Sequence, residues 1–123
     1  MAYPNDVANI SRKFTLFDDL WSPKIIAESN GWHVKLVKAQ GQFTWHSHED
    51  TDEIFIVESG QLVVELRHRK VVLGAGDMFV VPRGVEHRPD AGKGCRMLLI
   101  EPEGVPNTGD VTDEILSNTD EWI

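Results

Sequence analysis

Three histidines and one glutamate have residue types and spacings that suit a metal site. His46 and His48 are separated by one residue, so in an extended strand both imidazoles project from the same face. Glu53 follows a short polar turn that can return its carboxylate to this pair, and His87 follows a rigid proline–glycine turn. Three neutral imidazoles and one carboxylate favour a single divalent Mn, Fe, Co, Ni, Cu or Zn ion and leave coordination positions open.

The elements that must position these residues are short. Turn signals rich in glycine, proline, asparagine and aspartate recur along the chain, and the apolar runs between them are too brief for typical helices. The expected strands are 25–28, 32–38, 43–48, 53–58, 61–67, 70–73, 78–81 and 95–101. Asn30-Gly31 predicts a type I′ hairpin turn, because this pair tolerates positive φ at both central positions. Short helical turns are expected within 5–21 and 112–117. The pattern predicts an all-β sandwich or barrel.

The spacing of the ligands resembles the two motifs of the cupin family. The first motif is matched by Gly41, His46, His48, Glu53 and Gly60, and the second by Gly76, Pro82, Gly84 and His87. Two departures are mild: Gly41 is one residue closer to His46 than the motif has it, and Ala91 stands where the motif has asparagine. Neither departure falls on a ligand position.

The resemblance extends to the small cupins of the RmlC-like superfamily that are labelled mannose-6-phosphate-isomerase-like, through the stretches 17–23 and 107–110. It implies a double-stranded β-helix, the jelly-roll form of an antiparallel barrel, with one metal ion held by His46, His48, Glu53 and His87. It implies a single cupin domain over 1–123, with motifs at 41–60 and 76–91, an N-terminal arm 1–24 and a C-terminal tail 102–123. It also implies a homodimer.

Strand parity predicts which side chains line a pocket beside the metal. Gln42 and Thr44 share the parity of His46, while Phe55 and Val57 share that of Glu53. Of the basic residues on loops around His87, which are usually solvated charges, Arg88 is added to this expected pocket. The prediction is a cavity that is apolar at depth and has a few polar groups near the metal.

The remaining histidines and the single cysteine are expected to have ordinary structural roles. In strand 32–38 the apolar residues occupy positions 32, 34 and 36, so His33 and Lys35 should face away from that core set. His68 lies in a basic hairpin tip, and Trp45 should pack on the face opposite His46. Cys95, in an apolar run, should act as a small hydrophobe rather than a nucleophile.

Charge and composition exclude several partner classes. Twelve basic against twenty acidic residues give a net charge of -8, which repels nucleic acid and anionic membrane surfaces. The 123 residues suit one domain, and we find neither a signal-peptide pattern nor an apolar run of membrane-spanning length. A single cysteine fits a reducing compartment, so a cytoplasmic location is expected.

The chemistry predicts a small-molecule ligand but leaves the reaction open. A divalent ion with one carboxylate ligand keeps about one net positive charge, which favours an anionic or oxygen-chelating ligand such as a sugar phosphate, keto acid or dione. One hypothesis is a metalloenzyme with isomerase-like or dioxygenase-like chemistry; the alternative is a binding or sensing cupin that uses the metal to hold its ligand. A third is a structural dimer without metal. A proton-moving enzyme needs a second acid–base residue, and the sequence offers no clear candidate.

Overall fold

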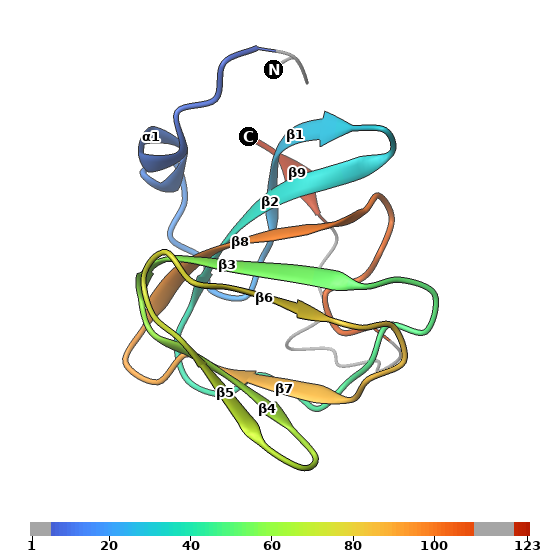
Figure 1. The fold of residues 1–123 in the computed structure, drawn as a ribbon. Helices are drawn as coiled ribbons and strands as arrows, with labels where there is room; N and C mark the ends of the chain where they lie inside the picture. Colours follow the sequence, from blue (N-terminus) through green and yellow to red (C-terminus); the bar gives the residue numbers. More distant parts are fainter. Residues whose placement is uncertain (1–5, 110–119) are drawn as a thin grey trace.

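The computed structural model describes residues 6–109 and 120–123, and nearly all of its regular structure is β (Figure 1). The elements are α1 (Ile10–Phe14), β1 (Lys24–Ser29), β2 (Trp32–Ala39), β3 (Glu53–Gly60), β4 (Leu62–Leu66), β5 (Lys70–Leu73), β6 (Met78–Val81), β7 (His87–Asp90), β8 (Cys95–Pro102) and β9 (Glu121–Trp122). The predicted all-β jelly-roll fold is confirmed. No helix among the described residues is long and apolar enough to cross a membrane.

Two sheets form the barrel. The larger sheet has the order β6-β3-β8-β2-β1-β9 and the smaller one β5-β4-β7. All strand pairs are antiparallel except β1 with β9, which places the C-terminal strand at the edge of the larger sheet. The β1–β2 turn has φ values of 53° at Asn30 and 78° at Gly31, as its sequence predicts.

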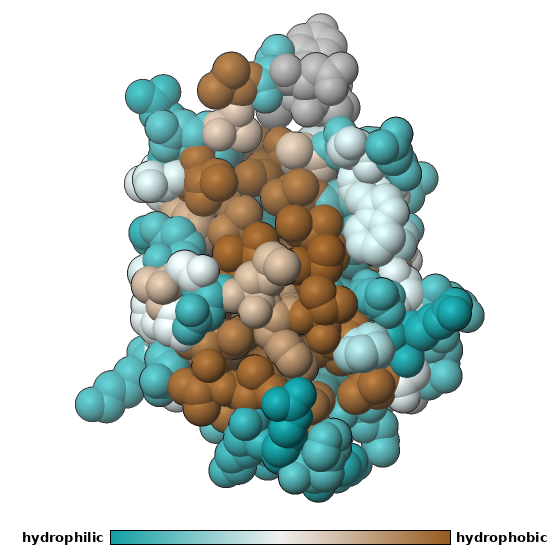
Figure 2. All heavy atoms as spheres, viewed as in Figure 1, coloured by the Kyte–Doolittle hydropathy of each residue, from teal (hydrophilic) through white to brown (hydrophobic). Residues whose placement is uncertain are grey.

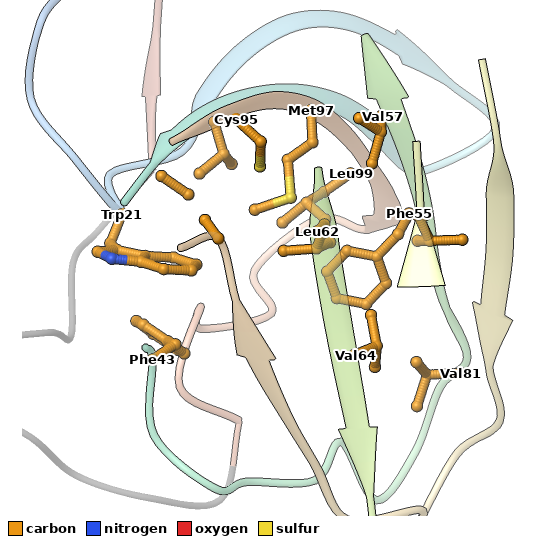
Figure 3. Close-up of a cluster of buried hydrophobic side chains, with 14 of the residues drawn as sticks. Trp21, Phe43, Phe55, Val57, Leu62, Val64, Val81, Cys95, Met97 and Leu99 are labelled. Carbon is orange, nitrogen blue, oxygen red and sulfur yellow. The ribbon is translucent and has the colours of Figure 1, made fainter. Parts of the chain in front are cut away.

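The core lies between the two sheets and results from strict alternation along the strands. In β8 every second residue from Cys95 to Glu101 is buried, and β3 alternates in the same way from Glu53 to Val57. Figure 3 shows side chains from both sheets meeting in this layer, with the rings of Trp21 and Phe43 together at one side. Burial raises the pKa of the Cys95 thiol to about 11, so this cysteine has the apolar role expected of it.

A second apolar cluster covers the outer face of β2. Phe14 of α1 and Phe17 pack with Ile26 and Leu36 on the side away from the barrel interior. The strand is therefore buried on both faces: Leu36 contacts the helix, while Val37 contacts the main core. This arrangement decides where the polar residues of β2 lie.

His33 and Lys35 do face away from Val34 and Leu36, as parity predicts, but the face they occupy is the barrel interior. Lys35 is 0% exposed and His33 is 7% exposed. Both faces of β2 are therefore covered, because α1 packs on the outer face and the barrel encloses the other.

The segment 43–48 is not the regular strand that we expected. It makes only isolated bridges to β7, Gln42 with Asp90 and His46 with His87. Between those bridges this segment advances four residues while β7 advances three, so one residue is extra and the side-chain alternation is interrupted. The α1 turn falls within the expected 5–21, while the expected turn at 112–117 lies outside the described residues.

Candidate metal centre

Backbone hydrogen bonds bring the two motifs together. The amide of His46 donates to the carbonyl of His87 at 3.0 Å, and the amide of His87 donates back to His46 at 2.9 Å. The amide of Gly84, in the turn before His87, donates to the carbonyl of His48 at 2.8 Å. Glu53 is the first residue of β3, so its carboxylate enters the site from the opposite sheet. The four predicted residues thus come from three segments that the barrel closes onto one point.

The four side chains form a compact buried cluster. One ligand atom from each residue lies within 4.8 Å of the others, and all four residues are buried. Nε2 of His48 and Nε2 of His87 each lie 3.2 Å from a different oxygen of Glu53. The imidazole centroids of His46 and His87 are 4.3 Å apart. These separations suit donors that share one cation.

Two of the imidazoles are oriented by backbone carbonyls. Nδ1 of His46 donates to the carbonyl of Thr44 and Nδ1 of His87 donates to that of Val85, both at 2.9 Å. Since a carbonyl only accepts, Nδ1 donates in both contacts, and Nε2 of each ring faces the cluster. Nε2 of His48 is buried and has no aligned hydrogen-bond partner among the described residues. A bound metal would satisfy this atom, so the residues present fit the ion that they were predicted to hold.

The electrostatics favour the protonation states that metal binding requires. Burial, aided by the nearby His87, lowers the pKa of His46 to about 4, so this imidazole is neutral near pH 7. Burial alone would raise the pKa of Glu53, but its interactions with His48 and His87 hold that pKa well below the usual range. A neutral imidazole beside a charged carboxylate is the state in which these donors bind a cation.

A second buried carboxyl group, which sequence reasoning missed, lies behind Glu53. Glu101 is 0% exposed, and its Oε1 accepts a hydrogen bond from Nζ of Lys35 at 2.8 Å. Burial first, and then the charge of Glu53, raise the pKa of Glu101 well above its usual value. Oε2 of Glu101 finds no hydrogen-bond donor among the described residues. The sequence could have indicated its burial, because Glu101 follows Met97 and Leu99 at every second position of the strand and so points to the same interior face.

A small cavity adjoins the ligand cluster. Its volume is about 20 Å³, room for one or two water-sized groups. The lining is mostly apolar and includes Trp21, Pro23, Val37, Phe43, His46, Glu53, Phe55, Pro89, Met97, Leu99 and Asn107. Asn107 is the lining residue with a polar side chain besides His46, Glu53 and the Trp21 indole, and its Nδ2 donates to the carbonyl of Trp21 at 3.0 Å.

Of the expected pocket residues, Phe55 lines this cavity and the others lie elsewhere. Gln42 is exposed, because the extra residue in 43–48 turns Phe43 inward in its place. Thr44 contributes its carbonyl to His46, and Val57 is buried in the core away from the cavity lining.

Arg88 turns away from the cavity. It is held by Glu65, to which its Nε and Nη2 donate at 3.0 and 2.6 Å. Its guanidinium also lies 5.1 Å from the ring centre of Trp45, which stacks with Arg67 at 3.8 Å. The packing role expected of Trp45 therefore suits its surroundings.

A second group of possible ligands lies on the β1–β2 hairpin and the end of β8. Nε2 of His33 is 3.8 Å from Glu28 and 3.6 Å from Glu103. Glu103 is well exposed to solvent and Glu28 is half-buried, and the imidazole of His33 also meets the ring of Trp122 edge-on at 5.7 Å. Acidic side chains that reach solvent often lie beside a histidine without binding a metal, so this group serves below as a control for metal stoichiometry.

Comparisons with known proteins bear on the family and the fold. The Cupin_2 family model, described as a cupin domain, matches residues 32–101. A cupin-2 domain containing protein from Shewanella frigidimarina NCIMB 400 is 49% identical, with a TM-score of 0.78 over 79% of this chain and 95% of that one. Protein NMB1881 from Neisseria meningitidis is 30% identical, with a TM-score of 0.73 over 80% of this chain and 100% of the other. Uncharacterized protein YdbB of Bacillus subtilis (strain 168) is 39% identical over 64 residues, which cover 51% of this chain and only 57% of that relative.

Proposed function

This chain belongs to the Cupin_2 family of cupin domains, and from that premise we propose that it holds one divalent transition-metal ion between His46, His48, Glu53 and His87. The observation that carries the proposal is a set of four buried donors in which two imidazoles are already fixed by carbonyls with Nε2 pointing inward. When bound, such an ion polarises a carbonyl or chelates an oxygenated ligand.

The proposed ligand is a small oxygenated metabolite. A divalent ion with the single charge of Glu53 keeps about one net positive charge in a buried site, which attracts an anionic or chelating group. The cavity of about 20 Å³ admits only such a group, so the remainder of the ligand would lie outside it or displace a wall residue. Isomerase-like and oxygenase-like chemistry both fit a chelated oxygen substrate, and we propose a metalloenzyme of this kind.

The alternative, a binding or sensing cupin, is supported by the cavity lining. Among its residues the polar side chains, apart from the two metal ligands, are those of Asn107 and Trp21, and neither is an acid or base near pH 7. Glu101 is close to Glu53 but is not among the lining residues, so any proton that it exchanges with a ligand would pass through Glu53.

We further propose that residues 1–123 form one cupin domain. The support is that both terminal regions contribute to the cavity: the arm 1–24 supplies Trp21 and Pro23, and the tail 102–123 supplies Asn107. The Asn107 amide donates to the Trp21 carbonyl and joins the two regions directly.

The test begins with metal stoichiometry. Titration of metal-free protein with Zn²⁺ or Co²⁺, followed by calorimetry, should give one tight equivalent per chain. A second equivalent that disappears in His33→Ala but survives in His87→Ala would belong to the Glu28–His33–Glu103 group. No tight binding of any transition metal would overturn the proposal.

Activity assays then separate the two candidate functions. Protein loaded with ferrous iron should consume oxygen with a dione or catechol if it is an oxygenase, and an isomerase should interconvert a sugar phosphate without oxygen uptake. Metal-dependent ligand binding without turnover across such a panel would favour the sensing alternative.

A homodimer is proposed from the outer face of the larger sheet. Aliphatic side chains from β6, β3 and β8 form two cross-strand rows there, Met78–Ile56–Leu98 and Val80–Ile54–Ile100. Met78 is 62% exposed, and Figure 2 shows a continuous hydrophobic band across this side of the molecule. A contiguous apolar sheet face of this kind is typical of an interface, and a second copy could cover it symmetrically.

Substitution Met78→Lys is expected to shift a sedimenting dimer to monomer, because it places a charge within the apolar band. Val72→Lys is the matched control, since Val72 is 57% exposed but lies on β5 in the other sheet. Sedimentation velocity at micromolar concentration measures the change. A wild-type protein that is monomeric there would contradict the homodimer.

A further inference from the structure

A buried ion pair lies beside the proposed metal centre. Lys35 and Glu101 are both 0% exposed, and Nζ of Lys35 lies 2.8 Å from Oε1 of Glu101. Removing two such groups from water is costly, and their mutual attraction only partly offsets the cost. Hydrophobic residues of similar size would stabilise this core as well or better, so the pair needs a reason other than stability.

Glu101 contacts the metal centre through Glu53. The β3–β8 register pairs Ile54 with Ile100, so the next position along both strands places Glu53 beside Glu101. Glu53 is 2% exposed and Glu101 is 0% exposed, so the two side chains are buried next to each other on the interior face of the sheet. A polar neighbour packed against a ligating carboxylate restricts the direction in which its oxygens point.

Lys35 contacts the C-terminal segment at the other end of the pair. Its ammonium forms a second ion pair with Asp120, which is 12% exposed. The residues that follow are attached to the same region of the barrel. Glu121 pairs with Lys24, the amide of Ile123 donates to the carbonyl of Ile25 at 3.1 Å, and Nζ of Lys13 donates to the carbonyl of Ile123 at 2.7 Å.

These contacts form one continuous chain of polar groups from the proposed metal ligand to the C-terminal segment. We propose that Glu101 and Lys35 are positioning residues for Glu53, and that through Asp120 they couple metal binding to docking of residues 120–123. The inference rests on the proposed metal site, because Glu53 must be a ligand for its orientation to matter. Coupling of this kind is reciprocal: if docking strengthens metal binding, metal binding strengthens docking by the same factor.

The first test replaces Glu101→Gln, which keeps the shape of the side chain and removes its carboxyl chemistry. Because partners of metal ligands typically contribute ten- to hundredfold to affinity, Co²⁺ binding measured by calorimetry should weaken by about tenfold or more. The visible spectrum of bound Co²⁺ should change as well, since it reports ligand geometry. Glu58→Gln is the matched control: Glu58 lies on β3, the strand of Glu53, but pairs with Arg96 at 2.7 Å.

The second test measures the coupling at the C-terminal segment. Asp120→Asn should weaken Co²⁺ binding by about threefold or more, a fraction of the effect of a direct partner, and Asp120→Glu should restore most of the affinity. In the wild-type protein, saturating Zn²⁺ should slow amide hydrogen exchange of the peptide containing 120–123, and Glu101→Gln should abolish that slowing.

The outcomes distinguish this inference from the proposed function. Wild-type protein that binds no metal overturns the metal site. Wild-type protein that binds Co²⁺ tightly, with Glu101→Gln and Asp120→Asn binding equally well and exchange at 120–123 unchanged by Zn²⁺, overturns the coupling alone. If Glu101→Gln is unfolded, the Asp120→Asn affinity and the exchange measurement still decide.

Discussion

Replacing His87 with alanine is expected to lower the affinity for Zn²⁺ or Co²⁺ by more than about a hundredfold. Substitution of residues that merely orient a ligand typically costs ten- to hundredfold, so loss of a ligand itself should exceed that range. His87 is 0% exposed, its Nδ1 is fixed by the Val85 carbonyl, and its Nε2 lies 3.2 Å from Glu53. Calorimetric titration of the metal-free variant measures the loss.

His68→Ala is the matched control, because His68 lies on the exposed turn between β4 and β5. It should bind metal like the wild type. Equal affinity of the His87→Ala and wild-type proteins would remove His87 from the ligand set and with it the link between the two motifs. Circular dichroism of both metal-free variants establishes that each is folded before its affinity is compared.

The substitution Lys35→Met is expected to destabilise the folded protein by about 3 to 5 kcal/mol, the usual cost of removing one partner from a buried ion pair. Methionine retains most of the aliphatic stem, so the main loss is the ammonium that serves Glu101 and Asp120 together. Urea denaturation of metal-free protein at neutral pH, extrapolated linearly to water, measures the free energy of unfolding.

Lys70→Met tests whether the effect depends on burial. The Lys70 side chain is 71% exposed and lies 3.8 Å from Glu65, so its removal should change stability by less than about 1 kcal/mol. A Lys35→Met protein that unfolds at the same urea concentration as the Lys70→Met protein would show that the buried pair contributes no net stability. The expected instability is also why the coupling experiments use Glu101→Gln and Asp120→Asn.

Local sequence signals predicted most of the strands because each run of β-branched and aliphatic residues ends at a turn residue. They failed at β7 (His87–Asp90), where no strand was expected because Pro89 is a turn signal. Proline is tolerated there because β7 is the edge strand of the smaller sheet, and the carbonyl of Pro89 accepts a hydrogen bond from the amide of Phe43. Strand β9 could not be foreseen either, since a two-residue parallel bridge to β1 depends on where the distant chain end returns.

The candidate ligands were predicted by motif spacing, whereas their surroundings required three dimensions. Parity assigned Gln42 to the pocket, but the extra residue in 43–48 reverses the alternation and brings Phe43 there instead. The alternation along β2 correctly placed Lys35 and Leu36 on opposite faces of the strand. It could not show which face points into the barrel, because α1 covers the outer face and both faces are therefore buried. The Glu101–Lys35 pair was missed for that reason, although each residue stands at an inward position of its strand.

The double covering of β2 has a consequence for how freely this chain can vary. An ordinary strand of a sandwich has a solvent face at every second position, where substitutions are nearly neutral. In β2 no residue from Trp32 to Ala39 is exposed, so neither face of the strand has positions where substitutions are nearly neutral. In a library of random variants, the folded proteins should therefore carry few substitutions at any position of β2. Natural or designed sequence changes would have to fall mainly in exposed turns, such as 67–70.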